Sequence, residues 1–203
     1  KVEYFPVFVF IGLTIWNLFN KTLVSSVKLV SSNRDTVTKV YVPKFILLIT
    51  KMCVNSVKFF ISFLLVIICM ICYQVPISLN IFYFGIIFIV LWIFTFGIST
   101  IFMHFGVFIQ DLANLTTIAL RLVFYMSGIF FAIETRVPAP YNDILINFNP
   151  IAACICQCRD ILLYKTPISF PLMGTWLAIG LVLSYIGVRI IYKYENTYVK
   201  VMK

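Results

Sequence analysis

Residues 31–43 read Ser-Ser-Asn-Arg-Asp-Thr-Val-Thr-Lys-Val-Tyr-Val-Pro, a short polar segment between two long apolar ones. The surrounding stretch 21–58 holds seven of the chain's sixteen basic residues against one carboxylate, Asp35; the seven are Lys21, Lys28, Arg34, Lys39, Lys44, Lys51 and Lys58. Basic residues beside apolar runs are typical of the cytoplasmic side of a membrane protein. We therefore expect residues 31–43 to form a cytoplasmic elbow between two membrane-spanning helices.

The composition of the 203-residue chain is that of a membrane protein. Of its residues 62% are hydrophobic and 11% are charged, and its mean hydropathy is +1.04, whereas about 25% of the residues of a soluble domain are charged. So few polar residues cannot cover a soluble core. The formal charge of +9 lies beside apolar runs, which favours anionic membrane lipid over nucleic acid as a partner, and we set nucleic acid aside.

Five apolar stretches are long enough to span a membrane, and they predict an all-α, polytopic helical membrane protein with five visible spans. They cover residues 5–30, 44–73, 79–109, 112–133 and 168–192. As a helix the second would be about 45 Å long, which exceeds the roughly 30 Å hydrocarbon core, so its first turns should project from the membrane. Within it Lys44, Lys51 and Lys58 are seven residues apart and should form one stripe along the helix.

The distribution of basic residues predicts the orientation. The stretch 21–58 around the elbow carries seven Lys and Arg residues and the C-terminal tail carries four, namely Arg189, Lys193, Lys200 and Lys203, whereas residues 134–167 are neutral. The positive-inside rule places the elbow and the C-terminus in the cytoplasm and residues 134–167 outside. Five spans with an external start lead us to expect one more helix before Lys1. We expect a single membrane domain over residues 1–203.

The external segment 134–167 should contain short helices of its own. Asn149 followed by Pro150 is typical of a helix N-cap with proline at the first helical position. Apolar and cysteine residues then recur at helical spacing until about Tyr164. About 15 residues cannot span a bilayer, so we expect this helix to be interfacial or re-entrant.

The sequence lacks the residue patterns of an enzyme or a metal site. No glycine is followed by lysine, which excludes a Walker-type phosphate loop and ATP hydrolysis by this chain. The one histidine, His104, has no carboxylate within a helical turn. The cysteine pair 69 and 72 has no partner pair, and Cys154, Cys156 and Cys158 have no fourth ligand, so we favour inert thiols and no metal. A disulfide among Cys154, Cys156 and Cys158 on the outer side remains an alternative.

Two basic residues within predicted spans pose a question of function. Arg121 lies ten residues beyond Asp111, about 15 Å along a helix and well below the headgroups. A charge at that depth either faces a partner or a water-filled path, or snorkels to the inner surface, and both alternatives stand. For Lys58 we favour snorkelling, because its lysine stripe leads to the cytoplasm.

The elbow and several later motifs resemble the ABC type-2 permeases that export cell-surface polysaccharides such as O-antigen and teichoic acid. The resemblance covers essentially the whole chain and rests on the order and spacing of the motifs together. Two positions depart from the family pattern, since Gln110 replaces an arginine and Gly128 replaces a proline. The matching segments are residues 16–19, 32–35, 38–44, 109–112 with Asn114, 127–131, 147–150 with Arg159, and 194–195.

The resemblance implies a bacterial inner-membrane subunit that moves a lipid-linked polysaccharide, with the family's first span absent from this sequence. Its functional unit would be a homodimer with two copies of a separate ABC ATPase, which binds the ATP and Mg; this chain would bind no cofactor. Residues for contact with the ATPase would be Asn33, Arg34, Asp35, Thr36, Lys39 and Pro43. Candidates for the transport path or its outer gate would be Arg121, Asn149, Pro150 and Arg159.

Other functions remain as alternatives. A permease of the same type for drug or lipid efflux is barely separable by sequence. A channel or secondary transporter would be expected to carry carboxylates in several spans or paired broken helices, and neither is present. A membrane transferase would need polar catalytic groups at one interface, where only Asp143, Asp160 and Arg159 are available.

Overall fold

The computed structural model describes residues 4–34, 43–76 and 79–201, and over these ranges the chain forms helices and turns without strands. This confirms the predicted all-α class. The helices are α1 (Phe5–Val27), α2 (Leu29–Ser32), α4 (Lys44–Cys72), the 3-10 turn η1 (Leu79–Tyr83), α5 (Phe84–Phe108), α6 (Leu112–Met126), α7 (Ile133–Arg136), α8 (Tyr141–Phe148), α9 (Pro150–Arg159), the π turn η2 (Asp160–Tyr164) and α10 (Phe170–Val201).

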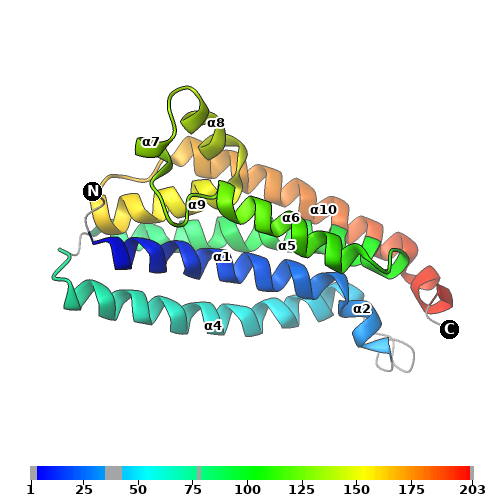
Figure 1. Cartoon of the computed structure of the whole chain (residues 1–203). Helices are drawn as coiled ribbons and strands as arrows, with labels where there is room; N and C mark the ends of the chain where they lie inside the picture. The colour runs from blue at the N-terminus through cyan, green and yellow to red at the C-terminus, as the bar shows by residue number, and fades with distance from the viewer. Residues whose placement is uncertain (1–3, 35–42, 77–78, 202–203) are drawn as a thin grey trace.

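Four of the helical segments are long and apolar enough to cross a membrane: α1, α4, η1 with α5, and α10. They run alongside one another in Figure 1. At one end of this bundle α1 leads into α2, α4 begins and α10 ends, and we call it the elbow end. At the other end α1 and α10 begin and α7 and α8 lie, and we call it the far end. These four helices confirm a polytopic membrane protein.

The predicted fourth span, residues 112–133, is helical only over its first part. α6 ends at Met126 after 15 residues, about 22 Å, which is shorter than the other spans. Ser127 caps the end, and Gly128 follows with a φ of 63°, the left-handed conformation that commonly ends a helix. The chain therefore turns at Gly128, where the family pattern has proline.

Among the helices described, α5 and α10 share the most extensive contact, and small residues allow their approach. A Cβ added to Gly97 would meet the Leu183 Cβ and the Ser184 nitrogen, both at 2.8 Å. A Cβ added to Gly180 would meet the Phe94 nitrogen at 3.0 Å. The Ser184 hydroxyl bonds to its own helix at Gly180 O, 2.7 Å away. Small residues at helix contacts are typical of membrane bundles, and here they join the third and last spans.

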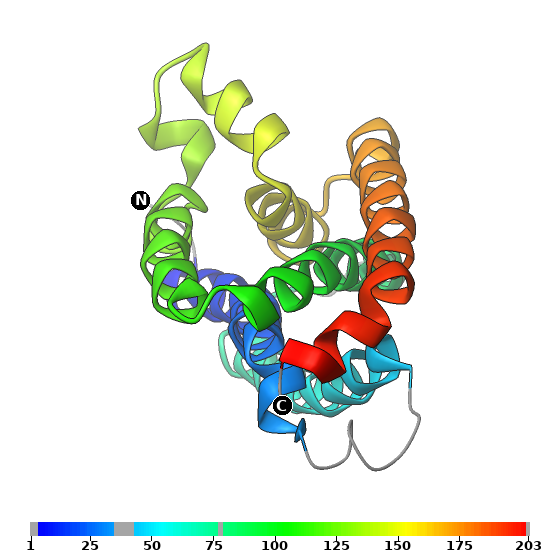
Figure 2. The same cartoon turned by 90° about the vertical axis from the view of Figure 1, so that its right-hand side faces the viewer.

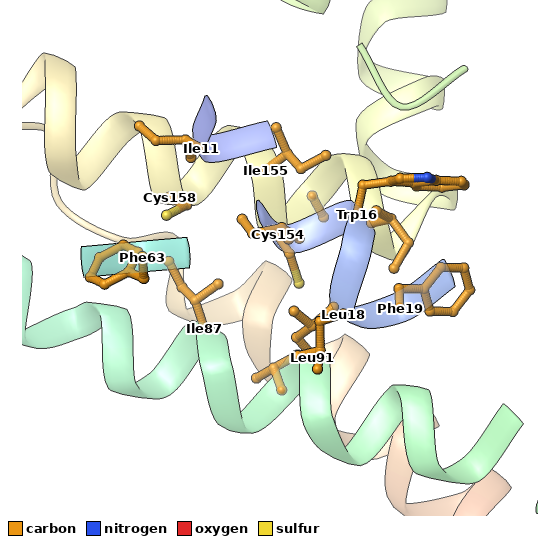
Figure 3. Close-up of a cluster of buried hydrophobic side chains, with 14 of the residues drawn as sticks. Ile11, Trp16, Leu18, Phe19, Phe63, Ile87, Leu91, Cys154, Ile155 and Cys158 are labelled. Carbon is orange, nitrogen blue, oxygen red and sulfur yellow. The ribbon is translucent and has the colours of Figure 1, made fainter. Parts of the chain in front are cut away.

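The main core lies in the far half of the bundle and includes the short helix α9. Nearly every α9 side chain is buried. Figure 3 shows Cys154, Ile155 and Cys158 of α9 near side chains of α1 and α5. The predicted re-entrant or interfacial helix is thus packed inside the bundle, against two spans.

The view from the elbow end shows how the remaining helices are placed. In Figure 2, α6 lies beside α1 and α10 lies beside α5, while α9 lies between them at greater depth. Many of the large exposed side chains on α4, α6 and α10 are apolar or aromatic. Such surfaces suit contact with lipid or with another membrane helix.

Candidate functional site

The elbow emerges from a helix that ends in two steps. α1 ends at Val27, Lys28 breaks the helical conformation with φ −97° and ψ 4°, and the single turn α2 follows. The Asn33 amide donates to Leu29 O at 2.8 Å and so closes that turn. On the other side of the elbow Pro43 is the N-cap of α4.

Of the predicted ATPase contacts, Asn33, Arg34 and Pro43 are described and lie at the two roots of the elbow. Asn33 is half-buried and Arg34 is exposed. Asp35, Thr36 and Lys39 lie outside the described residues. The contact role of all six stays a prediction.

A buried ion pair fixes the start of α4 to the end of α10. The Lys44 ammonium donates to Glu195 Oε1 at 2.9 Å, and the two residues are only 2% and 7% exposed. A buried charge is costly unless it is paired. The pair therefore fixes the position of the elbow's second root relative to α10.

A separate hydrophobic cluster lies beside this ion pair and joins α2, α4, α5 and α10 at the elbow end. It consists of Leu29, Val30, Leu48, Met52, Met103, Ile191 and Tyr198. In addition, the Tyr198 hydroxyl is 2.6 Å from Nδ1 of His104 on α5. We call the ion pair and this cluster the elbow base; it makes α2, α4, α5 and α10 one packed unit.

The predicted N-cap of α9 is confirmed, and it also bonds to α6. Asn149 Oδ1 accepts from the Ile151 and Ala152 nitrogens at 3.0 and 3.2 Å, and Pro150 is the first helical residue. The Asn149 amide donates to the Ser127 hydroxyl at 3.1 Å. One side chain thus starts α9 and attaches it to the end of α6.

Arg159, at the other end of α9, holds three segments together. Its guanidinium donates to Gly128 O and Ile129 O, each at 2.9 Å, and to Phe8 O at 3.1 Å. It also lies over the Phe8 ring at 3.3 Å from the centroid. A Cβ on Gly12 would be 2.9 Å from the guanidinium, so that glycine leaves room for it.

Arg159 is a buried cation held by neutral groups. It is 2% exposed, and its bonds satisfy the carbonyls of Gly128 and Ile129 in the turn that follows α6. Burial lowers the pKa of Arg159 to about 10, so that the guanidinium stays charged at neutral pH. Its described bonds make it a tie between α1, α6 and α9.

A cavity of about 650 Å³ lies at the far end beside Arg159, within the range of ordinary ligand pockets. Residues from α1, α7, α9 and η2 line it, including Glu134, Arg136, Asp160 and Tyr164. Burial, and then the nearby Glu134 carboxylate, raise the pKa of Asp160 to about 6. The charged lining carries two acids and two arginines.

The four predicted path or gate residues do not gather at one place. Asn149, Pro150 and Arg159 lie on α9, whereas Arg121 is exposed on α6. Within the described ranges no hydrogen bond or ion pair of Arg121 is found. The transport role of all four stays a prediction.

The cysteines of α9 are free and buried. Burial raises the pKa of the Cys154 and Cys156 thiols to about 12. Because the thiolate is the reactive form, both thiols are inert at neutral pH. This agrees with the packing role favoured for them.

Sequence reasoning missed two features of these sites. Lys44 was assigned to a stripe that sets orientation, and its partner Glu195 lies 151 residues away. A signal was present, since Glu195 is one of only seven acidic residues and its helix ends on the same side as α4 begins. No feature of the sequence indicated which backbone carbonyls Arg159 contacts.

Taken together, the fold and these sites define a helical, multi-pass membrane protein with a packed elbow base and a short helix, α9, buried against two of its spans. The chain is similar along its whole length to an O-antigen export system permease protein, RfbA, from Klebsiella pneumoniae. The two are 24% identical over 204 residues, which is 100% of this chain and 77% of the relative. No family model matches the chain.

Two further relatives carry the same name. A second protein from Klebsiella pneumoniae is 23% identical, again over 100% of this chain and 77% of the relative. One from Myxococcus xanthus is 23% identical over 175 residues, 86% of this chain and 67% of the relative. These similarities confirm the resemblance to polysaccharide-exporting permeases that the motifs predicted.

Proposed function

We propose that this chain is the membrane subunit of an ABC exporter that moves a lipid-linked cell-surface polysaccharide across the bacterial inner membrane. The full-length similarity to O-antigen export permeases carries this proposal. ATP and Mg bind to a separate ATPase, and two copies of this chain form the unit with two ATPases. The elbow and the C-terminus lie in the cytoplasm, and α7–α9 lie toward the outside.

The elbow base supports a mechanical role for the elbow. An ATPase can move a membrane helix only through a part that does not yield under load. The Lys44–Glu195 ion pair and the cluster beside it join the elbow's roots to α5 and α10. A displacement of the elbow by the ATPase is therefore passed on to the spans instead of being lost in loops.

At the far end, the ties of α9 suit an outer gate. Asn149 attaches the start of α9 to α6, and Arg159 attaches its end to α1 and α6. α1 continues into the elbow, so a movement of the elbow also moves α1. Because α9 is attached to α1, α9 moves with it. In this proposal α9 opens and closes the outer end of the path together with the elbow.

The test is export in a host from which the gene of this chain has been deleted. We expect loss of surface polysaccharide and accumulation of the lipid-linked polymer on the cytoplasmic side, both reversed by the wild-type chain. Surface polysaccharide is then compared between the wild type and the single variants Arg121→Gln and Arg159→Met at equal expression. Normal surface polysaccharide in the deletion, with loss of a different cargo such as a drug, would contradict the proposal.

A further inference from the structure

A small polar cleft lies between α1 and α4, away from both sites described above. Its lining includes two lysines and four uncharged polar side chains, contributed equally by the two helices. We call it the α1–α4 cleft; its polar residues are Thr14, Asn17 and Lys21 of α1 and Asn55, Lys58 and Ser62 of α4. Neither the elbow nor the far-end cavity uses these residues.

The cleft lies within the length of helix that the bilayer covers. Lys21 is 16 residues from the start of α1 and Lys58 is 14 residues from the end of α4, which is about 24 and 21 Å from the far end. The hydrocarbon core is about 30 Å thick. With the far ends of α1 and α4 placed at the outer boundary of the hydrocarbon, both lysines lie near its boundary on the elbow side, where lipid headgroups begin.

The two lysines have no counter-charge in the described part of the chain. No acidic side chain lines the cleft, and no described ion pair includes Lys21 or Lys58. The contrast is Lys44 in the same helix, which has Glu195. Intramembrane charges normally face a partner, so two of them in one cleft indicate an anion from outside the chain.

Snorkelling would account for either lysine by itself. It does not explain why the two lysines share one cleft with several uncharged polar side chains. The helices also bring the exposed amide of Asn17 to the cleft. The buried amide of Asn55 is held there by a bond of 3.0 Å to the Thr22 hydroxyl. Amides and ammonium groups are hydrogen-bond donors, and such donors together suit an oxyanion.

We propose that the α1–α4 cleft binds the phosphate group of a membrane lipid. Its volume of about 30 Å³ is about that of one water molecule, so that phosphate oxygens reach its mouth while a sugar does not fit. Val54 and Ile61, one turn on either side of Lys58, are 47% and 60% exposed. They provide an apolar surface for the acyl or prenyl chain of the same lipid.

The phosphate has two possible sources, an anionic phospholipid and the diphosphate of a polyprenyl carrier. Basic pockets between spans on the cytoplasmic side are known binding places for lipid headgroups. The inference depends on the bilayer and the cleft alone, so it does not require the export role. Binding can therefore succeed where export fails, and the reverse.

The experiment is native mass spectrometry of the purified, detergent-solubilised chain with three added lipids. The probes are phosphatidylglycerol, a polyprenyl diphosphate and diacylglycerol, which has the chains without phosphate. We expect the wild type to retain a phosphate lipid but not diacylglycerol. The double variant Lys21→Gln/Lys58→Gln should bind at least about tenfold more weakly, a loss of about 1.4 kcal/mol.

The matched control is Lys28→Gln/Lys51→Gln, which removes the same charge at the C-cap of α1 and in α4, outside the cleft. It should bind as the wild type does, and both variants should keep the wild-type elution profile. Stronger retention of phosphatidylglycerol assigns the cleft to a phospholipid, and stronger retention of the diphosphate assigns it to the carrier. Equal binding by the cleft variant and the wild type, or an equal loss in the control, would overturn the proposal.

Discussion

At the scale of single residues, Arg159 shows how a cation is stabilised in this bundle without a carboxylate. Three backbone carbonyls and the face of Phe8 surround its guanidinium. Hydrogen bonds to a charged group contribute about 1.5–3 kcal/mol each, and a carbonyl left without a partner costs about 1–3 kcal/mol. Arg159 therefore stabilises the junction of α1, α6 and α9 more than its position in a short helix suggests.

The variant Arg159→Met keeps much of the side-chain length and removes the donors. We expect it to lower the stability of the solubilised chain by at least about 2 kcal/mol, or about 5 °C in melting temperature. The matched control is Arg121→Met, which removes an exposed arginine and should change the melting temperature little. Equal effects of the two variants would show that Arg159 is not the tie described here.

Asp160 makes stability depend on pH. Its pKa is raised from 3.8 to about 6 by burial and by Glu134, against the smaller opposing effects of a hydrogen bond from Thr166 and the charge of Arg159. The folded state therefore binds the proton more tightly than the unfolded state does. The charged carboxylate destabilises the fold above pH 6, and this penalty is progressively relieved as pH falls from about 6 to 4.

We therefore expect the wild-type melting temperature to rise relative to that of Asp160→Asn as pH is lowered from 7 to 5. Thermal unfolding of both proteins in the same detergent measures this difference. A constant difference over that pH range would exclude Asp160 as the titrating group.

Residue-scale prediction succeeded where the signal was local. Asn149 and Pro150 are adjacent, and an N-cap followed by proline has the same meaning in any fold. The partners of Arg159 were not predictable in this way, since they are carbonyls of residues 8, 128 and 129. Carbonyls carry no sequence signal, and only the tertiary fold brings them together.

At the scale of elements, the elbow base decides whether the elbow is rigid. Removal of one partner of a buried ion pair leaves a charge without compensation, at a cost of about 3–5 kcal/mol. The cluster beside the pair contains residues of α2, α4, α5 and α10. Damage at Lys44 or Glu195 should therefore loosen several helices together.

The charge reversals Lys44→Glu and Glu195→Lys should each destabilise the chain and reduce export, and the double reversal should recover most of both. Melting temperature and surface polysaccharide are measured for all three. Lys193→Glu reverses an exposed charge on the same helix and should leave both near wild type. No recovery in the double variant would show that the two residues do not act as a pair.

The long apolar stretches of the sequence predicted where the spanning helices lie, but they did not predict where α6 ends. Residues 112–133 are mostly apolar, with Arg121 as the one charged residue, so composition extends the span to Ile133, whereas the chain leaves the helix at Ser127. The reason is the left-handed conformation of Gly128, combined with tertiary bonds from Arg159 and Asn149 near the turn. Those bonds compete with continued helix and lie beyond any local pattern.

At the scale of the whole molecule, two layers of contacts organise the bundle. The elbow base joins the helices at one end, and the main core with α9 joins them at the other. α1 and α5 run from one layer to the other. This arrangement suits a subunit in which a push on the elbow is felt at the far end.

The central claim is that a separate ATPase drives this chain through the elbow. The most direct measurement is affinity purification of the full-length chain from its native membrane, with ATP hydrolysis and partner subunits determined in the eluate. We predict that the wild type copurifies an ABC ATPase and that Arg34→Glu/Lys39→Glu, equally expressed and folded, does not. An eluate of the wild type without any nucleotide-binding subunit, or full retention of the ATPase by the variant, would contradict the account.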